Sequence, residues 1–501
     1  MEIPALLRQD GSPPLHYLLL HGWMALAGSG EAATRSLSLL LAGLAAPTAW
    51  WAAAAVAGRR AAWLAAAGAA GCPFLTYHAQ ESRMYSLAAL LSIVVAAAFV
   101  LGVVRGRRRH LVTLAASAVA VLYTHTWGVF LVAGLAVAWL ALWHAGRAGA
   151  REGVLVGAAV ALAYAPWVPS LLFQALHTAA PWAERPPLLY LLGVPGALFG
   201  YIAAPILVVA ALRAGCDDTT QPRASPHASL RGDALRRRAS PDAAPRDDAV
   251  RPLLVAAASG VALAWACAQL QPAWSPRYLA VFFGPLLLWL VVRLARGGRG
   301  TVVALAIVGL AWAVGEPTAA RSNVRTAVTG LGVRAGDLVV STQPEQVPVL
   351  HRYLPAGVAY LTPLGTPADP SMLDWRDALP RLRAGRARST LLPRLHALPP
   401  GARVLLVTPV GRSSGAPWSR AVRARTRGWR AAIRADSRLR FVVQTGRPER
   451  RFRSAVRAEL YEVRAHHGRR APAAGASTLA RSSDVGQGAR AAAASMASAR
   501  R

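Results

Sequence analysis

The sequence of 501 residues contains no lysine, few cysteines and few charged residues. All 56 basic residues are therefore arginine, and alanine is also very abundant. This indicates a compositional bias, with arginine and alanine in place of lysine and isoleucine, rather than one binding surface. A nucleic-acid-binding domain would carry a basic face with interleaved aromatic residues. These arginines instead lie in short loops between apolar runs or scatter along the C-terminal part, which argues against a nucleic-acid partner.

The scarcity of cysteine and of charge excludes two further classes of protein. Cys72, Cys216 and Cys267 lie far apart, without the spacing of a metal or redox site, and we expect them to be small buried residues. Charged residues make up 16% of the chain, against about 25% in soluble domains, while 54% are hydrophobic. This composition excludes an ordinary soluble enzyme and predicts a polytopic membrane protein with a water-exposed C-terminal part.

Ten apolar segments are long enough, or nearly so, to cross a membrane. They cover residues 36–57, 61–77, 84–104, 111–125, 127–145, 153–171, 187–212, 252–270, 278–295 and 300–316. None alternates like a strand, and a helix satisfies all its backbone polar groups in lipid, so we expect helices.

The loops between these segments fall into two alternating sets. One set, which includes Arg59, Arg107 and the segment 213–251, holds nineteen arginines, whereas the other holds only Arg83, Arg185 and Arg277. The positive-inside rule places the first set in the cytoplasm and the second on the outer face of the cell membrane. The N-terminal residues then also lie outside, and we expect a further helix, encoded upstream of Met1, to carry them across.

The sequence divides into several regions. Residues 1–35 form an outer-face loop with an interfacial helix, and residues 36–316 form the transmembrane domain. Within it, the Arg-, Asp-, Ser- and Pro-rich segment 213–251 reads as a disordered cytoplasmic loop. Residues 318–465 alternate short apolar runs with helix-like stretches, which predicts a small α/β domain with a mainly parallel sheet on the outer face. The tail 466–501 is rich in Ala, Ser and Arg and is expected to be disordered.

Three outward loops concentrate the polar residues. The first, QDGSPPLHYLLLHGW, contains Asp10 and two prolines that permit a helix to begin, and His16 in it either bonds locally or faces headgroups rather than binding metal. The second, TYHAQESRMYSL, carries Glu81 and Arg83 at a membrane boundary, where unpaired charge is expensive. The third, QPAWSPRYL, carries Arg277 and Tyr278, for which snorkelling and an aromatic belt are the alternative explanations.

Together these loops resemble the bacterial membrane glycosyltransferases of the GT-C superfamily, related to protein O-mannosyltransferases and to the aminoarabinose transferase of lipid A. The resemblance covers residues 10 to about 316 and rests on SPPLHYLLLHGW, YHAQESRMYSL and SPRYL in order and on the same side. It implies a GT-C-like polytopic fold that transfers a monosaccharide, with inversion, from a polyprenyl-phosphate donor to a hydroxyl of a lipid, glycan or protein.

The resemblance also implies roles for individual residues. Arg83 and Arg277 match motif arginines that bind the donor phosphate, for which the planar guanidinium is suited. Glu81 matches a motif acid that orients the sugar or binds a divalent cation. Pro13, Pro14 and Tyr17 match the PPL-x-Y element that shapes the donor pocket. His16, in the same element, and Tyr278, next to Arg277, are further candidates for the donor site.

The sequence departs from the family's pattern in its acidic motif. The family's Asp-Glu pair, which supplies the catalytic base, lies upstream of the PPL element and has no counterpart here, so Asp10 is the nearest acid. The chain could thus be a truncated, inactive homologue, or a scaffold that works through its C-terminal domain. A transporter or flippase would show two repeated halves and charges at mid-membrane, whereas here the charges cluster in the loops.

Overall fold

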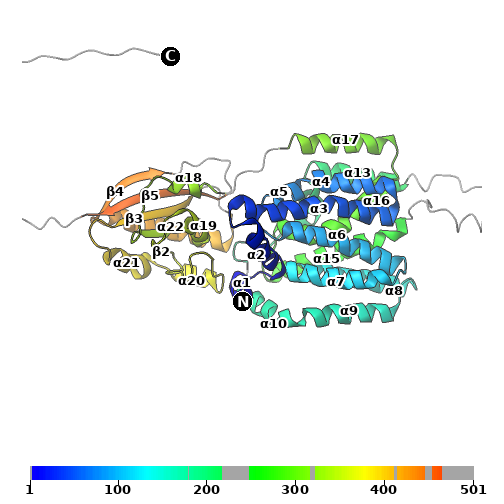
Figure 1. The fold of residues 1–501 in the computed structure, drawn as a ribbon, viewed down its shortest axis with the longest axis horizontal. Helices are drawn as coiled ribbons and strands as arrows, with labels where there is room; N and C mark the ends of the chain where they lie inside the picture. Colours follow the sequence, from blue (N-terminus) through cyan, green and yellow to red (C-terminus); the bar gives the residue numbers. More distant parts are fainter. Residues whose placement is uncertain are drawn as a thin grey trace, which may run out of the picture.

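The computed structural model describes residues 3–178, 180–216, 247–315, 322–410, 414–445 and 454–464. These residues form a bundle of apolar helices and a smaller α/β domain that lie end to end (Figure 1). The predicted fold class, a polytopic helical protein with a small C-terminal α/β domain, is confirmed. Most of the predicted loop 213–251 and all of the tail 466–501 lie outside the described residues.

The helical domain begins with two helices on either side of the prolines of the first loop and continues through a series of apolar helices. Its elements are α1 (Ile3–Asp10), α2 (Leu15–Ala27), α3 (Glu31–Ala57), α4 (Arg59–Gly71), α5 (Pro73–His78), α6 (Tyr85–Phe99), η1 (Val100–Val104), α7 (Arg109–Thr124), α8 (Gly128–His144), α9 (Ala150–Tyr164), η2 (Ala165–Trp167), α10 (Val168–His177), α11 (Leu189–Leu192), α12 (Val194–Phe199), α13 (Ala203–Cys216), η4 (Asp247–Ala249), α15 (Arg251–Leu270), η5 (Pro276–Phe282), α16 (Phe283–Leu294) and α17 (Arg299–Ala313).

Five helical stretches among the described residues are long and apolar enough to cross a membrane. They are Glu31–Ala57, Tyr85–Val104, Ala150–His177, Arg251–Leu270 and Pro276–Leu294. Large apolar side chains such as Leu39, Val112 and Leu162 remain exposed on the bundle, as expected of a surface that faces lipid rather than water.

Two predicted spans are not single helices. Cys72, with an extended backbone, divides the segment 61–77 into α4 and α5. The segment 187–212 is divided into α11, α12 and α13, because Pro195 begins a new helical turn and Gly200, at φ +89°, ends α12. Only α13 continues as a long apolar helix in this region.

The bundle is held together by small residues that let helix backbones approach closely. A Cβ on Gly134 of α8 would lie 2.0 Å from the carbonyl oxygen of Ala256 on α15, and one on Gly260 would lie 2.5 Å from that of Phe130. Since lipid tails are as apolar as leucine, such close packing, rather than the hydrophobic effect, favours helix association in a membrane.

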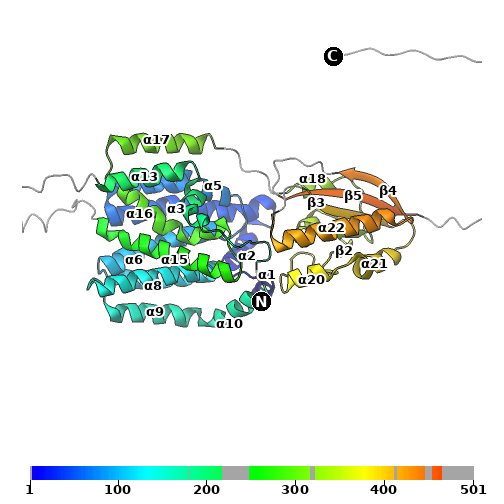
Figure 2. The same ribbon diagram turned by 180° about the vertical axis from the view of Figure 1, so that it is seen from behind.

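The α/β domain is a five-stranded sheet with helices on both faces. Its elements are α18 (Val324–Val328), β1 (Leu338–Ser341), η6 (Pro344–Gln346), α19 (Val347–Tyr353), β2 (Ala359–Leu361), α20 (Ala378–Ala384), η7 (Ala387–Leu391), α21 (Leu392–His396), β3 (Arg403–Val410), α22 (Pro417–Ala435), β4 (Leu439–Thr445) and β5 (Ala455–Val463). The strand order is β2-β1-β3-β5-β4, and α22 lies across one face of the sheet (Figure 2).

The sheet is mixed rather than mainly parallel. β1 pairs in parallel with β2 and β3, whereas β5 pairs antiparallel with β3 and β4. The prediction missed β5, whose charged Arg457, Glu459 and Glu462 break the apolar run. Glu459 is nevertheless fully buried, because it forms an ion pair with Arg430 of α22.

The two domains meet at one end of the helix bundle, which we call the junction end. There the backbone N–H of Trp375 donates to the carbonyl of Gln9 (3.1 Å), and that of Trp418 donates to the carbonyl of Pro181 (3.1 Å). The indole rings of Trp182, Trp375 and Trp418 pack against one another in sequence at steep angles, with centroids 4.5 and 5.1 Å apart. The α/β domain is therefore docked on the loops of the helical domain.

Candidate functional site

The three loops singled out in the sequence converge at the junction end. Tyr85, 3% exposed at the start of α6, lies at the centre of the cluster. Its ring lies 5.9 Å from Cζ of Arg277 and 6.5 Å from the ring of Tyr278. Arg83 lies two residues before Tyr85, and its charge repels that of Arg277. The structure thus brings together the two arginines predicted to bind phosphate.

A chain of hydrogen bonds connects Arg83 to the first loop. Nη1 of Arg83 donates to the hydroxyl of Tyr17 (3.3 Å), which donates to Oγ of Ser12 (3.4 Å). Ser12 in turn donates to Oδ2 of Asp10 (2.6 Å). Because all three donors point the same way, the carboxylate of Asp10 orients the hydroxyl groups that hold the guanidinium of Arg83.

The local sequence explains why this chain can form. Gly11 has φ +80°, a conformation that reverses the backbone between α1 and Ser12, and a Cβ there would lie 2.7 Å from Oγ1 of Thr178. Nε2 of Gln174 donates to the carbonyls of Leu7 and Ser12, which holds the turn from the side of α10. The buried Pro13 and Pro14 then lead directly into α2.

Arg277 is held by aromatic rings rather than by a carboxylate. Ser275 is extended and Pro276 begins η5, so the chain changes direction immediately before Arg277. Its Cζ lies 5.4 Å from the ring centre of Tyr278, within the range of a cation–π interaction. Tyr278 is fixed in turn by the rings of His125 (5.0 Å) and Trp127 (5.3 Å).

Neither arginine forms an ion pair with an acidic side chain in the part of the chain that the structure describes. Among the described residues no carboxylate lies within 4.0 Å of the guanidinium of Arg83 or of Arg277. Arg83 is exposed and Arg277 is half-buried, with its Nε buried and without a hydrogen-bond partner. Two neighbouring cations that form no ion pair with a described carboxylate provide a site for an anion, and planar guanidinium groups pair well with phosphate oxygens.

Tyr17 and His16, which lie beside Arg83, are neutral. Burial raises the pKa of Tyr17 from its ordinary value, so its hydroxyl keeps its proton. Nδ1 of His125 accepts a hydrogen bond from the backbone N–H of Trp127 (3.0 Å), so this nitrogen carries no proton. Burial and then Arg83 lower the pKa of His16 to about 4, and its ring is completely buried. His16 therefore supports the site from within the protein.

Glu81 lies in the interior. It is 5% exposed, and its Oε2 lies 3.1 Å from Nδ1 of His78. The ring of His78 packs 4.7 Å from that of Tyr85. The structure thus places Glu81 behind His78, one contact removed from Tyr85, whereas Asp10 belongs to the hydrogen-bond chain that ends on Arg83. Within the described residues, no group of three or more His, Cys, Asp and Glu side chains could hold a metal ion.

The sequence predictions gave no role in the site to three of the residues that build this cluster. Tyr85 stands two positions after Arg83, in the same motif, and that spacing was the available signal. Ser12 and His125 carry no such signal, because their roles depend on a tight turn and on a ring contact between distant segments.

Comparisons with known proteins are sparse. No family model matches the chain, and no curated protein matches it. Two solved structures do: ArnT from Cupriavidus metallidurans in the apo state (19% identity, TM-score 0.43) and ArnT from the same organism bound to undecaprenyl phosphate (20% identity, TM-score 0.42). Each match covers 60% of this chain, and the chain spans about half the length of these structures, 52% and 53%.

Proposed function

We propose that this protein is a membrane glycosyltransferase that moves a monosaccharide from a polyprenyl-phosphate donor to a hydroxyl acceptor on the outer face of the cell membrane. The observation that carries the proposal is the pair of guanidinium groups, Arg83 and Arg277, at one end of an apolar helix bundle without a carboxylate among the described residues within ion-pair distance. A lipid-linked phosphate is the anion that such a location would meet. The loop motifs, which resemble those of GT-C enzymes, support the same donor.

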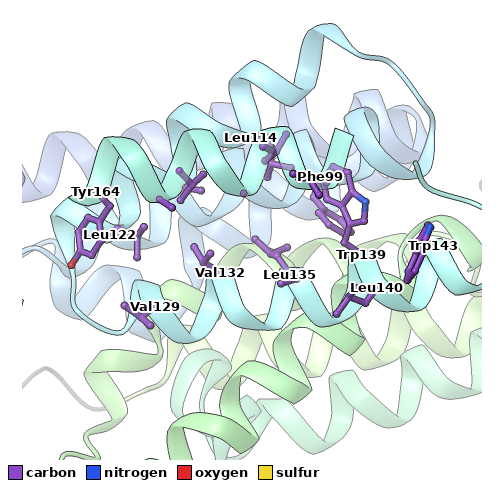
Figure 3. A pocket seen from close by; sticks show the side chains of 18 of the residues that line it. Phe99, Leu114, Leu122, Val129, Val132, Leu135, Trp139, Leu140, Trp143 and Tyr164 are labelled. Carbon is purple, nitrogen blue, oxygen red and sulfur yellow. The ribbon is translucent and has the colours of Figure 1, made fainter. Parts of the chain in front are cut away.

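An apolar pocket beside the site suits the lipid chain of such a donor. It has a volume of about 620 Å³ and lies between α7, α8 and α9. Figure 3 shows Tyr164, Leu122 and Val129 at one end of the pocket and Trp139 and Trp143 toward the other. Val129 lies two residues after Trp127, which contacts Tyr278 of the arginine cluster. A chain bound in this pocket would therefore approach the site at the junction end.

The chemistry follows from the charges. When the anomeric carbon is attacked, negative charge develops on the departing phosphate, and two preorganised guanidinium groups stabilise that charge. Tyr17 holds Arg83 in place through its hydroxyl. Direct displacement inverts the anomeric carbon. The acceptor hydroxyl loses its proton to a carboxylate, and we assign this role to Asp10. Glu81 is the second carboxylate that we include in the catalytic site.

The direction in which the site faces is part of the proposal. The arginine-rich loops that the structure describes lie at the end of the bundle away from the α/β domain (Figure 1), where Arg60 donates to the carbonyl of Gly297 and Arg108 forms an ion pair with Glu152. The positive-inside rule supports a cytoplasmic location for that end, and the site and the α/β domain then face outward. Donors linked to polyprenyl phosphate suit this side, because nucleotide sugars are absent there.

The experiment measures release of polyprenyl phosphate, which does not require the acceptor to be known. Full-length protein in lipid nanodiscs is incubated with radiolabelled polyprenyl-phosphate mannose or glucose and total bacterial membrane lipids. We expect Arg83→Ala and Arg277→Ala each to lower the rate about 100-fold, the usual effect of removing one donor to a developing charge. Arg185→Ala, an exposed arginine of a neighbouring loop, is the matched control and should retain the wild-type rate. Near-normal release by Arg83→Ala or Arg277→Ala would contradict the assignment.

A further inference from the structure

A second cavity lies between the helical domain and the α/β domain. It has a volume of about 340 Å³, and its walls come from the end of α10, the loops at residues 180–183 and 271–272, and residues 375–380. Neither domain alone encloses it. Its volume lies at the lower end of the range for small-molecule sites, which are concave, mostly apolar and supplied with a few convergent polar groups.

The polar groups of this cavity are a histidine and an aspartate from different domains. Nδ1 of His177 lies 3.3 Å from Oδ2 of Asp377, and the backbone N–H of Asp377 donates to the carbonyl of His177 (2.8 Å). Both side chains remain accessible, at 41% and 59% exposure. Asp377 also has a left-handed backbone (φ 47°, ψ 34°), the one such non-glycine residue among those described. Backbone strain of this kind concentrates at ligand sites.

The rest of the lining indicates the chemistry of the ligand. Four prolines, Pro181, Pro272, Pro380 and Pro417, and the indole of Trp375 supply rigid apolar faces. Among the residues that the structure describes, no arginine lines the cavity, although the chain contains 56 of them. An anionic headgroup would require such a cation, so the lining suits a neutral ligand. A sugar ring combines an apolar C–H face, which fits proline and indole, with hydroxyls that bond to a carboxylate and an imidazole.

The cavity adjoins the arginine site. Trp375 forms one of its walls, and the backbone N–H of Trp375 donates to the carbonyl of Gln9 (3.1 Å), the residue before Asp10. From Asp10 the hydrogen-bond chain continues through Ser12 and Tyr17 to Arg83. A ligand in the cavity therefore lies next to the acid that we assign to the acceptor hydroxyl.

From this arrangement we propose that the α/β domain completes an acceptor site: the cavity at His177, Asp377 and Trp375 binds a neutral sugar or polyol group of the acceptor. The inference rests on the proposed function and adds the chemical class of the second substrate to it. It also gives the α/β domain a role, since Asp377 and Trp375 belong to that domain.

The test separates this cavity from the arginine site with two probes and four variants of the full-length protein in nanodiscs. The probes are methyl α-D-mannopyranoside, followed by saturation-transfer NMR, and polyprenyl phosphate, followed by equilibrium binding. We expect Asp377→Asn and Trp375→Leu to weaken binding of the glycoside at least 10-fold and to leave polyprenyl phosphate unaffected. Asp369→Asn, an exposed carboxylate of the same domain, is the matched control and should change neither. Arg83→Ala should weaken only the binding of polyprenyl phosphate.

Each outcome supports or overturns one of the two assignments. Wild-type glycoside binding by Asp377→Asn and Trp375→Leu would overturn the acceptor site, as would equal binding of cyclohexanol, a ring of similar size with one hydroxyl. Wild-type binding of polyprenyl phosphate by Arg83→Ala would instead overturn the donor site. If Asp377→Asn does not fold, as judged by near-UV circular dichroism, His177→Gln replaces it, with the same 10-fold loss expected.

Discussion

The close contact between α6 and α16 provides a quantitative test of how the helix bundle is packed. The backbone N–H of Gly284 donates to Oγ of Ser92 (2.8 Å), and Ser92 donates to the carbonyl of Ala89 (2.7 Å). A Cβ on Gly284 would lie 2.2 Å from both the carbonyl carbon and oxygen of Ser92 and 2.4 Å from the nitrogen of Ile93. Since these are backbone atoms, no rotamer change can relieve the overlap, and the helices must separate by about 1 Å.

Gly284→Ala should therefore destabilise the protein. Overpacking of a filled core costs about 1–3 kcal/mol, and weakening the hydrogen bond to Ser92 adds about 1 kcal/mol. The higher helix propensity of alanine returns up to about 1 kcal/mol. A net loss of about 2 kcal/mol corresponds to a fall of roughly 4–8 °C in the unfolding temperature.

The measurement is scanning fluorimetry of the detergent-solubilised full-length protein, with Gly309→Ala as the control. Gly309 lies on α17, and a Cβ there would meet no atom within 4 Å. This substitution should leave the unfolding temperature unchanged or raise it slightly. An unfolding temperature of Gly284→Ala within 1 °C of wild type, or an equal fall in Gly309→Ala, would refute the described packing of α6 against α16.

Two further substitutions test the site and the α/β domain. Tyr17→Phe removes the hydroxyl that accepts a hydrogen bond from Arg83. Because that bond is long (3.3 Å), we expect the binding of polyprenyl phosphate to weaken only about 3- to 10-fold. An unchanged affinity would show that the hydrogen-bond chain does not position Arg83. Burial pushes the pKa of Glu459 upward, but hydrogen bonds from Arg430 and Tyr461 and the nearby positive charges outweigh it and lower the pKa. Its stabilising effect is then complete above the unfolded value of about 4.3 and is lost as the pH falls through the lower folded value. Glu459→Gln should accordingly cost about 1–3 kcal/mol at pH 7, with a gap to wild type that closes in acid; a gap of constant size in pH-dependent unfolding would contradict this assignment.

The sequence predicted most of the helical domain because long apolar runs have few alternative structures. Its failures have physical causes. The segment 187–212 is apolar throughout, but Pro195 and Gly200 divide it, and composition alone does not register such breaks. β5 was missed because Glu459 reads as a surface residue until Arg430, on a different element, neutralises it.

The candidate site was predictable only in part. Arg83 and Arg277 stand in recognisable motifs, and the structure brings both to Tyr85. The connection from Asp10 to Arg83 was not predictable, because it depends on the turn at Gly11. The pair His177 and Asp377 is separated by 200 residues, and only the docking of the two domains brings its members together.

Equilibrium binding of polyprenyl phosphate to the full-length protein in nanodiscs tests the assignment of the two arginines most directly. Hydrogen bonds to charged groups are worth about 1.5–3 kcal/mol each, so Arg83→Ala and Arg277→Ala should each weaken binding about 10- to 100-fold, whereas Arg185→Ala should leave it unchanged. Wild-type affinity in the Arg83→Ala, Arg277→Ala double variant, or an equal loss in Arg185→Ala, would contradict the phosphate site and with it the proposed transferase.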